Sequence, residues 1–281
     1  MIGAIIGDIV GSRFEFNNHK SKDFDLFTNE CRLTDDSILT LAIAKAIMES
    51  EKVVKYTLAS QFKNDEYCKI LENMTVKYLK ELGNKYPHSG YGTMFRRWLH
   101  QSESKPYNSF GNGAAMRISP VGYFARTIDD IYMLSKCVTG VTHNHEEGYK
   151  GAEAIAVSIF LARCGLHKNE IKKKIEDKYY NLNFTIDEIR DEYEFSATCQ
   201  KSVPQAIVAF LESTSFEDAI RIAISLGGDS DTIAAITGSI AQAYYLVPKE
   251  LEEKALTYFD KELTDIYEQW NLFMENRNCL Y

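Results

Sequence analysis

Two short acidic clusters carry the side chains best suited to chemistry in this sequence. Each contains two aspartates and a threonine: Thr34, Asp35 and Asp36 in the first, and Asp229, Asp231 and Thr232 in the second. Carboxylate and hydroxyl oxygens are hard ligands, which suit Mg²⁺ or Mn²⁺ better than Zn²⁺ or Cu²⁺; Ca²⁺ is an alternative, although no recognised calcium loop is present. Two such ions together can clamp substrate oxygens and lower the pKa of a water. If the fold brings the clusters together, they predict a hydrolase with a two-metal centre.

Helix capping is the structural alternative for both clusters. Each cluster precedes an apolar segment, at 37–48 and 233–243, and segments this apolar predict buried helices. Threonine caps helices well, and carboxylates favour the first turn, so each cluster taken singly is more simply a cap. If the two helix ends meet inside the protein, however, four carboxylates repel one another unless cations lie between them. The pairing therefore favours a metal site.

Two glycine-containing segments are candidates for binding phosphate groups. Residues 108–113 read NSFGNG, and residues 90–92 read GYG. Glycine allows backbone amides to approach a phosphate closely, and the Ser109 hydroxyl adds a donor. The alternative is a tight turn with glycine at positive φ. Neither segment matches a Walker or Rossmann pattern.

Two further residues could contact a ligand. His143 lies in THNHEEG, where a hydrogen bond to a ligand hydroxyl is a simpler role than metal binding, and where Thr142 or Asn144 could cap the helix that contains the apolar run 152–161. Glu15, in GDIVGSRFEF, is either an exposed surface glutamate or a functional residue of a loop.

The elements that position these residues are predicted to be helices. Apolar residues recur mainly at helical spacing and only five prolines interrupt the chain. Segments 170–180 and 249–270 have the pattern of amphipathic surface helices, whereas 84–122 is rich in glycine and proline and predicts loops around a short helix at 95–100. We expect an all-α, compact, multi-helix protein in which residues 1–281 form a single domain.

Composition limits the partners. The 281 residues carry a net charge of −8, which disfavours nucleic acid and anionic membranes. No apolar run approaches the ~20 residues of a membrane-spanning helix, and Asp8 interrupts the apolar N-terminus, so a secretory signal is not expected. The six cysteines show no metal-type spacing and are expected to be reduced, structural thiols. We expect a cytoplasmic monomer.

Several motifs together resemble one known family. In chain order they are GDIVGSRFEF, TDDS, HSGYG, NSFGNGAAMR, VTHNHEEGYKGAEA, VPQAI and SLGGDSDTIAAITGSIAQAYY. This series resembles the ADP-ribosylglycohydrolases over nearly the entire chain. The resemblance implies an all-α fold with a binuclear Mg²⁺ or Mn²⁺ centre whose ligands are Thr34, Asp35, Asp36, Asp229, Asp231 and Thr232.

The same resemblance implies roles for the other candidates. The residues that would hold the diphosphate and proximal ribose are Gly90, Tyr91, Gly92, Ser109, Phe110, Gly111 and Asn112. His143 would approach the adenosine side, and Glu15 would lie on the loop that closes over the scissile bond. As a hypothesis for the chemistry, Asp35 or Asp36 orients the attacking water and accepts its proton.

The implied activity is that of an ADP-ribosyl glycohydrolase. It cleaves the bond at C1 of an ADP-ribosyl group on a protein or small-molecule acceptor and releases ADP-ribose. The sequence does not identify the acceptor, although the acidic surface slightly favours arginine over serine. Two alternatives stay open: a metal-dependent hydrolase of the diphosphate or of a free nucleotide sugar, and a noncatalytic protein that binds ADP-ribose.

Overall fold

Helices provide all the regular structure in the part of the chain that the computed structural model describes, residues 1–56 and 64–278. Within those residues one isolated bridge, between Gly111 and Thr198, pairs extended backbone. The helices are α1 Ile2–Gly11, α2 Asp35–Tyr56, α3 Asn64–Lys85, α4 Thr93–Leu99, α5 Gly113–Met116, α6 Ser119–Phe124, α7 Ile128–Gly140, α8 Glu146–Arg163, α9 Lys168–Lys178, α10 Ile186–Ile189, α11 Cys199–Glu212, α12 Phe216–Ser225, α13 Ser230–Tyr244, α14 Lys249–Leu256 and α15 Lys261–Asn278. The predicted all-α fold class is confirmed.

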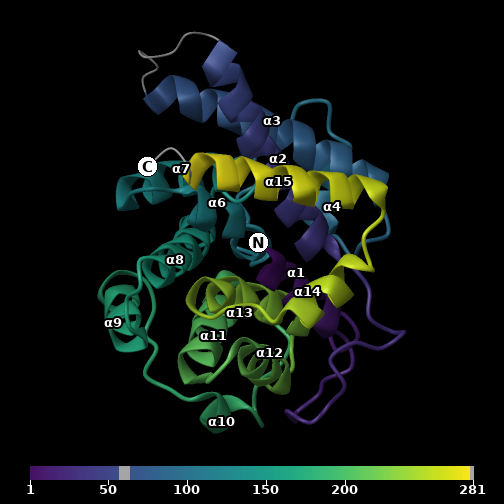
Figure 1. The fold of residues 1–281 in the computed structure, drawn as a ribbon, viewed down its shortest axis with the longest axis vertical. Helices are drawn as coiled ribbons and strands as arrows, with labels where there is room; N and C mark the ends of the chain where they lie inside the picture. The colour runs from purple at the N-terminus through teal and green to yellow at the C-terminus, as the bar shows by residue number, and fades with distance from the viewer. Residues whose placement is uncertain (57–63, 279–281) are drawn as a thin grey trace.

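Helices α1 and α13 form the centre of the molecule and lie in direct backbone contact (Figure 1). Every residue of α1 is buried. A Cβ on Gly7 would lie 2.1 Å from the carbonyl oxygen of Ala234, and a Cβ on Gly3 would lie 2.3 Å from that of Gly238. Only glycine permits an approach this close, so the glycines of α1 fix its depth against α13.

The two helices that follow the acidic clusters are buried as expected. The segment 37–48 lies in α2, which packs against α3 and α15, and the segment 233–243 lies in α13, which packs against α1, α11 and α12. Ile38, Leu41, Ile233 and Ile236 are each at most 1% exposed. Because both helices are in the core, the residues that precede them are carried inside the protein.

The surface helices differ in detail from their predicted bounds. Segment 170–180 corresponds to α9, whereas 249–270 is divided between α14 and α15. The division occurs at Asp260, whose side chain accepts a hydrogen bond from the backbone N–H of Leu263 at 3.0 Å and so caps the start of α15. Periodicity alone does not detect this break, because the apolar spacing continues across it.

Segment 84–122 contains more helix than expected. The predicted short helix at 95–100 is α4, but two further short helices, α5 and α6, follow the glycine-rich loop. The cap of α8 is also different: the Nδ1 atom of His145 accepts a hydrogen bond from the backbone N–H of Glu147 at 3.1 Å, so neither Thr142 nor Asn144 is the cap. The Thr142 hydroxyl instead forms hydrogen bonds with Arg117 and His143.

The expectation of reduced cysteines is wrong for one pair. Cys68 of α3 and Cys137 of α7 form a disulfide across 69 residues of sequence. Cys31, Cys164 and Cys199 are free, and Cys279 lies outside the described residues. No local pattern indicates the pair, because two facing helices, and not a short spacing, bring the sulfurs together. Among the described helices, none combines the length and apolar character needed to cross a membrane.

Candidate active site

A cavity of about 410 Å³ opens where the ends of several helices meet. Its wall includes most of the residues predicted from the sequence: Glu15, Asp35, Asp36, Gly90, Gly92, Ser109, Phe110, Gly111, Asn112, His143, Asp229, Asp231 and Thr232. Two predicted residues, Thr34 and Tyr91, do not line it. The fold therefore brings together side chains separated by some 200 residues in the sequence.

Two groups of carboxylates lie at one end of this cavity, and we call them together the acidic end. Asp8, Asp36 and Asp231 form the first group, and Glu15, Asp229 and Asp231 form the second. Within each group, one oxygen atom of every member lies within 4.8 Å of the others. Asp231 belongs to both groups, so the two groups are adjacent and share one carboxylate.

Asp8 is a member of the acidic end that sequence reasoning missed. It is fully buried in α1 and accepts hydrogen bonds from the backbone N–H groups of Thr34 and Ser37, at 3.0 and 3.1 Å. The hydroxyls of the same two residues also donate to it. Asp8 thereby fixes the start of α2, which carries Asp35 and Asp36. The signal that could have found it is a lone aspartate in an otherwise apolar segment with glycines four residues apart.

Asp36 has one oxygen that lacks any protein partner. Its Oδ2 atom accepts a long hydrogen bond from the Thr232 hydroxyl at 3.3 Å and lies 3.4 Å from the Thr34 hydroxyl oxygen, whose hydrogen is donated to Asp8. Its Oδ1 atom is buried and has no hydrogen-bond partner. An orphaned, buried carboxylate oxygen is costly unless a ligand occupies the space beside it. The acidic end therefore fits a bound cation, and its all-oxygen donor set fits a hard one.

The charges of the acidic end are not balanced by the protein. None of its carboxylates, nor Asp35, forms an ion pair with a lysine, arginine or histidine in the described part of the chain. Burial, followed by repulsion from Asp231, raises the pKa of Glu15 to about 8. Burial raises the pKa of Asp229 to about 6. Without cations, these acids hold protons that ordinary surface acids lose.

The same two causes act more strongly on the deeper acids. Burial first, and repulsion from Asp231 second, raise the pKa values of Asp35 and Asp36 well above the ordinary range. For Asp231 the causes are burial and then the charge of Asp229. Divalent cations would reverse these shifts because they favour the charged carboxylates.

The second acidic cluster does not serve as a helix cap. Asp229 occupies the position before α13, but its side chain accepts no capping bond. Instead its Oδ2 atom accepts a hydrogen bond from the side-chain amide of Asn112 at 2.7 Å, and that amide also donates to Ser202. Gly227 and Gly228, both at φ +73°, make the turn that leads from α12 into this position. The first cluster retains a weak cap, since the Asp36 N–H donates to the Thr34 hydroxyl at 3.3 Å.

A second group of residues, here called the neutral end, consists of Arg117 and His143 of the cavity wall and of Thr142, which lies between them. Arg117 is 2% exposed and donates from Nη2 to the Thr142 hydroxyl at 2.6 Å. That hydroxyl lies 2.8 Å from His143 Nδ1. Since the oxygen accepts from Arg117, its single hydrogen is available to Nδ1, which leaves the proton of a neutral His143 on Nε2.

The electrostatics of the neutral end support that protonation state. Burial, and secondly the charge of Arg117, lower the pKa of His143 well below its ordinary value, so the ring is neutral. Arg117 itself forms no ion pair within the described residues, and burial lowers its pKa only to about 10. The neutral end thus presents an N–H donor beside a buried, unpaired cation.

The glycines of the 108–113 loop have close neighbours, and their backbone angles do not call for glycine. Within the 108–113 loop Asn108 is the one residue with a positive φ, so the positive-φ glycine considered from the sequence is wrong for Gly111 and Gly113, although it holds for Gly90 of the other segment. A Cβ on Gly111 would lie 3.1 Å from the Ser109 hydroxyl, and one on Gly113 would lie 3.3 Å from His143 Nε2. The loop therefore stays narrow enough for His143 to reach the cavity.

The other glycine segment divides between cavity and core. Gly90, at φ +97°, lies against Asp35, and the preceding Ser89 carbonyl accepts the Asp35 N–H at 2.7 Å. Tyr91 turns away, is 3% exposed and packs on Phe95 with ring centroids 5.4 Å apart. Gly90 and Gly92 line the cavity, whereas Tyr91 packs against Phe95, which also lines it.

Apolar side chains stand at the rim of the cavity. Met94, Phe110 and Phe195 line it and are each about half exposed, at 49%, 47% and 49%. Exposed aromatic side chains beside a polar cavity are suited to hold a flat ring. A ligand that spans the cavity would meet carboxylates at one end and aromatic rings at the rim.

Comparison with known proteins identifies relatives that match nearly all of the chain. A family model described as ADP-ribosylglycohydrolase matches residues 1–277. The chain is 24% identical to "ADP-ribosylhydrolase ARH3" of Homo sapiens over 96% of its own length and 90% of that protein. It is 26% identical to "ADP-ribosylarginine hydrolase Tri1" of Pseudomonas putida (strain GB-1) over 90% of its own length and 72% of that protein.

A solved structure shares the fold. It is described as an "ADP-ribosylglycohydrolase-related protein complex", and it superposes with a TM-score of 0.62 at 20% sequence identity, covering 92% of this chain and 94% of the other. At this identity the similarity concerns the arrangement of helices alone.

Proposed function

The chain belongs to the ADP-ribosylglycohydrolase family and is an ADP-ribosyl glycohydrolase; from that premise we propose that it releases ADP-ribose from modified arginine side chains in a metal-dependent reaction. The observation that carries the proposal is one cavity lined both by carboxylates without ion-pair partners and by hydrogen-bond donors, among them His143 and Arg117. Arginine is favoured as acceptor because one relative is named for ADP-ribosylarginine and because this chain is acidic.

Two divalent cations, Mg²⁺ or Mn²⁺, fit the acidic end. The residues that would hold them are Thr34, Asp35, Asp36, Asp229, Asp231 and Thr232. Asp8 and Glu15 belong to the same carboxylate groups and would complete the negative surroundings. When bound, such ions neutralise the carboxylates and lower the pKa of a water.

The carboxylates would then perform the hydrolytic step. We assign Asp35 or Asp36 to orient the water that attacks C1 of the ribose and to accept its proton at a carboxylate oxygen. Glu15 is partly buried in the wall of the same cavity, where its charge would favour the positive character that develops at C1 in a glycosidic transition state. The bond from C1 to the acceptor nitrogen breaks, and the acceptor leaves as an unmodified side chain.

The neutral end would bind the remainder of the ADP-ribosyl group. The Nε2–H of His143 is available to a ligand oxygen, and Ser109 still has a hydroxyl hydrogen to donate after accepting the Gly111 N–H at 3.1 Å. Arg117 supplies positive charge near the diphosphate. Phe110 at the rim would pack against the adenine. One copy of the chain, acting as a single domain over residues 1–281, supplies every side chain in this assignment.

Product analysis tests the proposal. Arginine-linked and serine-linked ADP-ribosyl peptides would be incubated with the protein in Mg²⁺, Mn²⁺ or chelator, and the products identified by mass spectrometry. We expect intact ADP-ribose and unmodified arginine peptide with either cation and no release in chelator. AMP or phosphate as product would instead establish hydrolysis of the diphosphate. Binding of ADP-ribose without release of any product would establish a noncatalytic member.

A further inference from the structure

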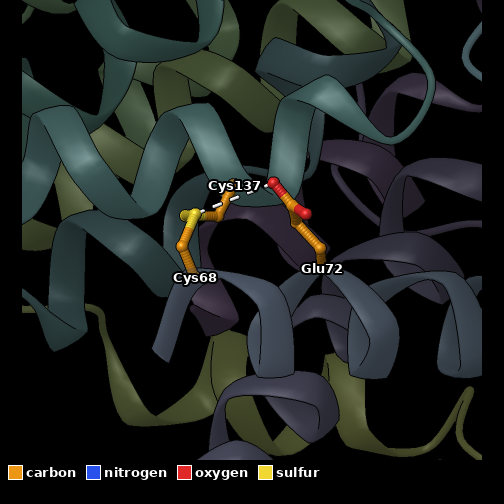
Figure 2. The surroundings of a disulfide bond; sticks show 3 residues. All are labelled: Cys68, Glu72 and Cys137. Carbon is orange, nitrogen blue, oxygen red and sulfur yellow. Dashed lines mark hydrogen bonds between the residues drawn. A yellow bond between two sulfur atoms is a disulfide. The ribbon is translucent and has the colours of Figure 1, made fainter. Parts of the chain in front are cut away.

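A second cluster of metal-type side chains lies outside the active-site cavity, on helices α3 and α7. It consists of Cys68 and Glu72 of α3 and Cys137 of α7 (Figure 2). None of the three lines the active-site cavity. One ligand atom of each lies within 4.8 Å of the others. The cluster differs from the acidic end in offering two sulfur atoms and one carboxylate.

The disulfide of this cluster is accessible from one side. Cys137 is buried, Cys68 is half-buried and Glu72 is exposed. A cavity of about 520 Å³ adjoins the pair and is lined by Asp65, Cys68, Lys69, Glu72, Met133 and Lys136. A small thiol can therefore approach Cys68 from solvent, whereas the Cys137 sulfur is shielded by the protein. Access of this kind is what thiol–disulfide exchange requires.

The position of Glu72 is unexplained by the disulfide itself. Cys68 and Glu72 are four residues apart and so share one face of α3. The Glu72 Oε1 atom lies 3.7 Å from the Cys68 sulfur, the contact drawn as a dashed line in Figure 2. A sulfur in a disulfide has no hydrogen to donate, so this contact becomes a hydrogen bond only after reduction. The carboxylate thus fits the dithiol form better than the oxidised one.

We propose that the Cys68–Cys137 disulfide is reducible and that its dithiol form, with Glu72, is a binding site for a thiophilic divalent cation of the zinc class. Two molecules of a small thiol would reduce the bond, yielding two cysteine thiols and one external disulfide. Cation binding then displaces the two thiol protons. Two thiolates, one carboxylate and a water complete the four ligands typical of zinc.

The surroundings suit this occupant. Lys69 and Lys136 line the adjoining cavity and offset part of the negative charge of two thiolates and a carboxylate; Asp65 is the one further acid in that wall. The cavity leaves room for the fourth, water ligand. Because the disulfide crosslinks α3 to α7, oxidation and cation binding are alternative ways of joining the same two helices.

Cobalt titration tests the proposal. The full-length protein would be reduced with a phosphine, freed of reductant under anaerobic conditions and titrated with Co²⁺, while free thiols are counted chemically. We expect two additional thiols on reduction and a near-ultraviolet thiolate-to-cobalt charge-transfer band. Cobalt at the acidic end does not produce this band because that site contains no thiolate.

Variants separate this site from alternatives. Cys137→Ser should abolish the band. Glu72→Gln should leave the thiol count unchanged but weaken cobalt binding by at least about 10-fold, because mutating even a residue that only contacts the metal ligands lowers metal affinity about 10–100-fold. Cys164→Ser, which removes an exposed free cysteine, is the matched control and retains the band. Reduced wild-type protein with two new thiols but no band would overturn the proposal, as would a thiol count that does not rise. Neither outcome bears on hydrolase activity.

Discussion

The acidic end and the neutral end of the cavity differ in how the protein treats buried charge. At the acidic end, carboxylates from α1, α2 and α13 converge, and none of them forms an ion pair within the described residues. At the neutral end a single buried cation, Arg117, orients a neutral histidine through one hydroxyl. The difference teaches that the acidic end leaves its carboxylates without ion-pair partners, as a site for cations would, whereas the neutral end orients its donors through hydrogen bonds within the chain. Perturbing each end should therefore give different kinds of change.

Asp231→Asn should have the largest effect because Asp231 belongs to both carboxylate groups. We expect the rate of ADP-ribose release to fall by roughly 10²–10³-fold or more, since metal assistance is worth several kcal/mol. In chelator the same variant should melt at a higher temperature than wild type, because the folded protein no longer has to keep this buried acid protonated. Kinetic assays and thermal denaturation with and without Mn²⁺ measure both changes.

The matched control for that variant is Asp265→Asn, an exposed acid paired with Lys261 on α15. It should leave activity, and the effect of chelator on melting, unchanged. Wild-type turnover in Asp231→Asn would remove Asp231 from the metal centre and with it the contrast between the two ends.

Asp8→Asn should reduce stability more than activity. The carboxylate accepts hydrogen bonds from two backbone N–H groups and two hydroxyls, and an amide that presents an NH₂ group to these donors cannot replace it. We expect the free energy of unfolding to fall by about 2–4 kcal/mol. Urea denaturation measures the change.

Asp218→Asn provides the comparison on the surface. Asp218 also accepts hydrogen bonds at a helix start, from Thr214, but it is partly exposed. We expect Asp218→Asn to lower the free energy of unfolding by less than about 1 kcal/mol. If both variants lowered the free energy of unfolding equally, burial of Asp8 would not strengthen its contribution to stability.

Stability in chelator should depend on pH with a negative slope. Burial raises the pKa of Glu15 to about 8 and that of Asp229 to about 6, from ordinary values near 4. The folded protein therefore binds more protons than the unfolded chain between about pH 4 and 8, so its stability falls as pH rises through this window.

Melting temperatures at pH 5.5 and pH 8 measure this slope, since about 1 kcal/mol shifts the melting temperature of a protein this size by about 2–4 °C. Saturating Mn²⁺ should flatten or reverse the dependence, because cations favour the charged carboxylates. A melting temperature in chelator that rises from pH 5.5 to pH 8 would contradict the unbalanced charge of the acidic end.

Thr142→Val should have the smallest effect and alter binding alone. It removes the hydroxyl that links Arg117 to His143, so Nε2 is no longer held as the donor. We expect KM, and the Kd for ADP-ribose, to rise about 10-fold, as for one lost hydrogen bond, with kcat and manganese affinity near wild type.

Thr142→Ser, which keeps the hydroxyl, should restore most of the affinity. If serine and valine impaired binding equally, the packing of the Thr142 methyl group, and not its hydrogen bonds, would explain the loss.

Much of the fold could be predicted from local patterns. The helices that begin near Asp35 and Ser230 can be predicted because their apolar residues leave no polar face. Helices of this kind have to be surrounded by other elements, so the sequence also predicts that they lie in the core. The break at Asp260 and the cap at His145 were not, because each depends on one side-chain hydrogen bond that the apolar spacing does not record.

By itself the sequence determined that two oxygen-rich clusters precede two buried helices, and that these clusters, with the glycine segments, resemble one family. Only the tertiary structure decided which other residues join them. Asp8 enters the acidic end because glycines on α1 allow backbone contact with α13, and Arg117 reaches His143 through Thr142. Cys68 meets Cys137 because α3 and α7 pack together. Residue type records what a side chain can do, whereas its partners follow from long-range packing that no local spacing encodes.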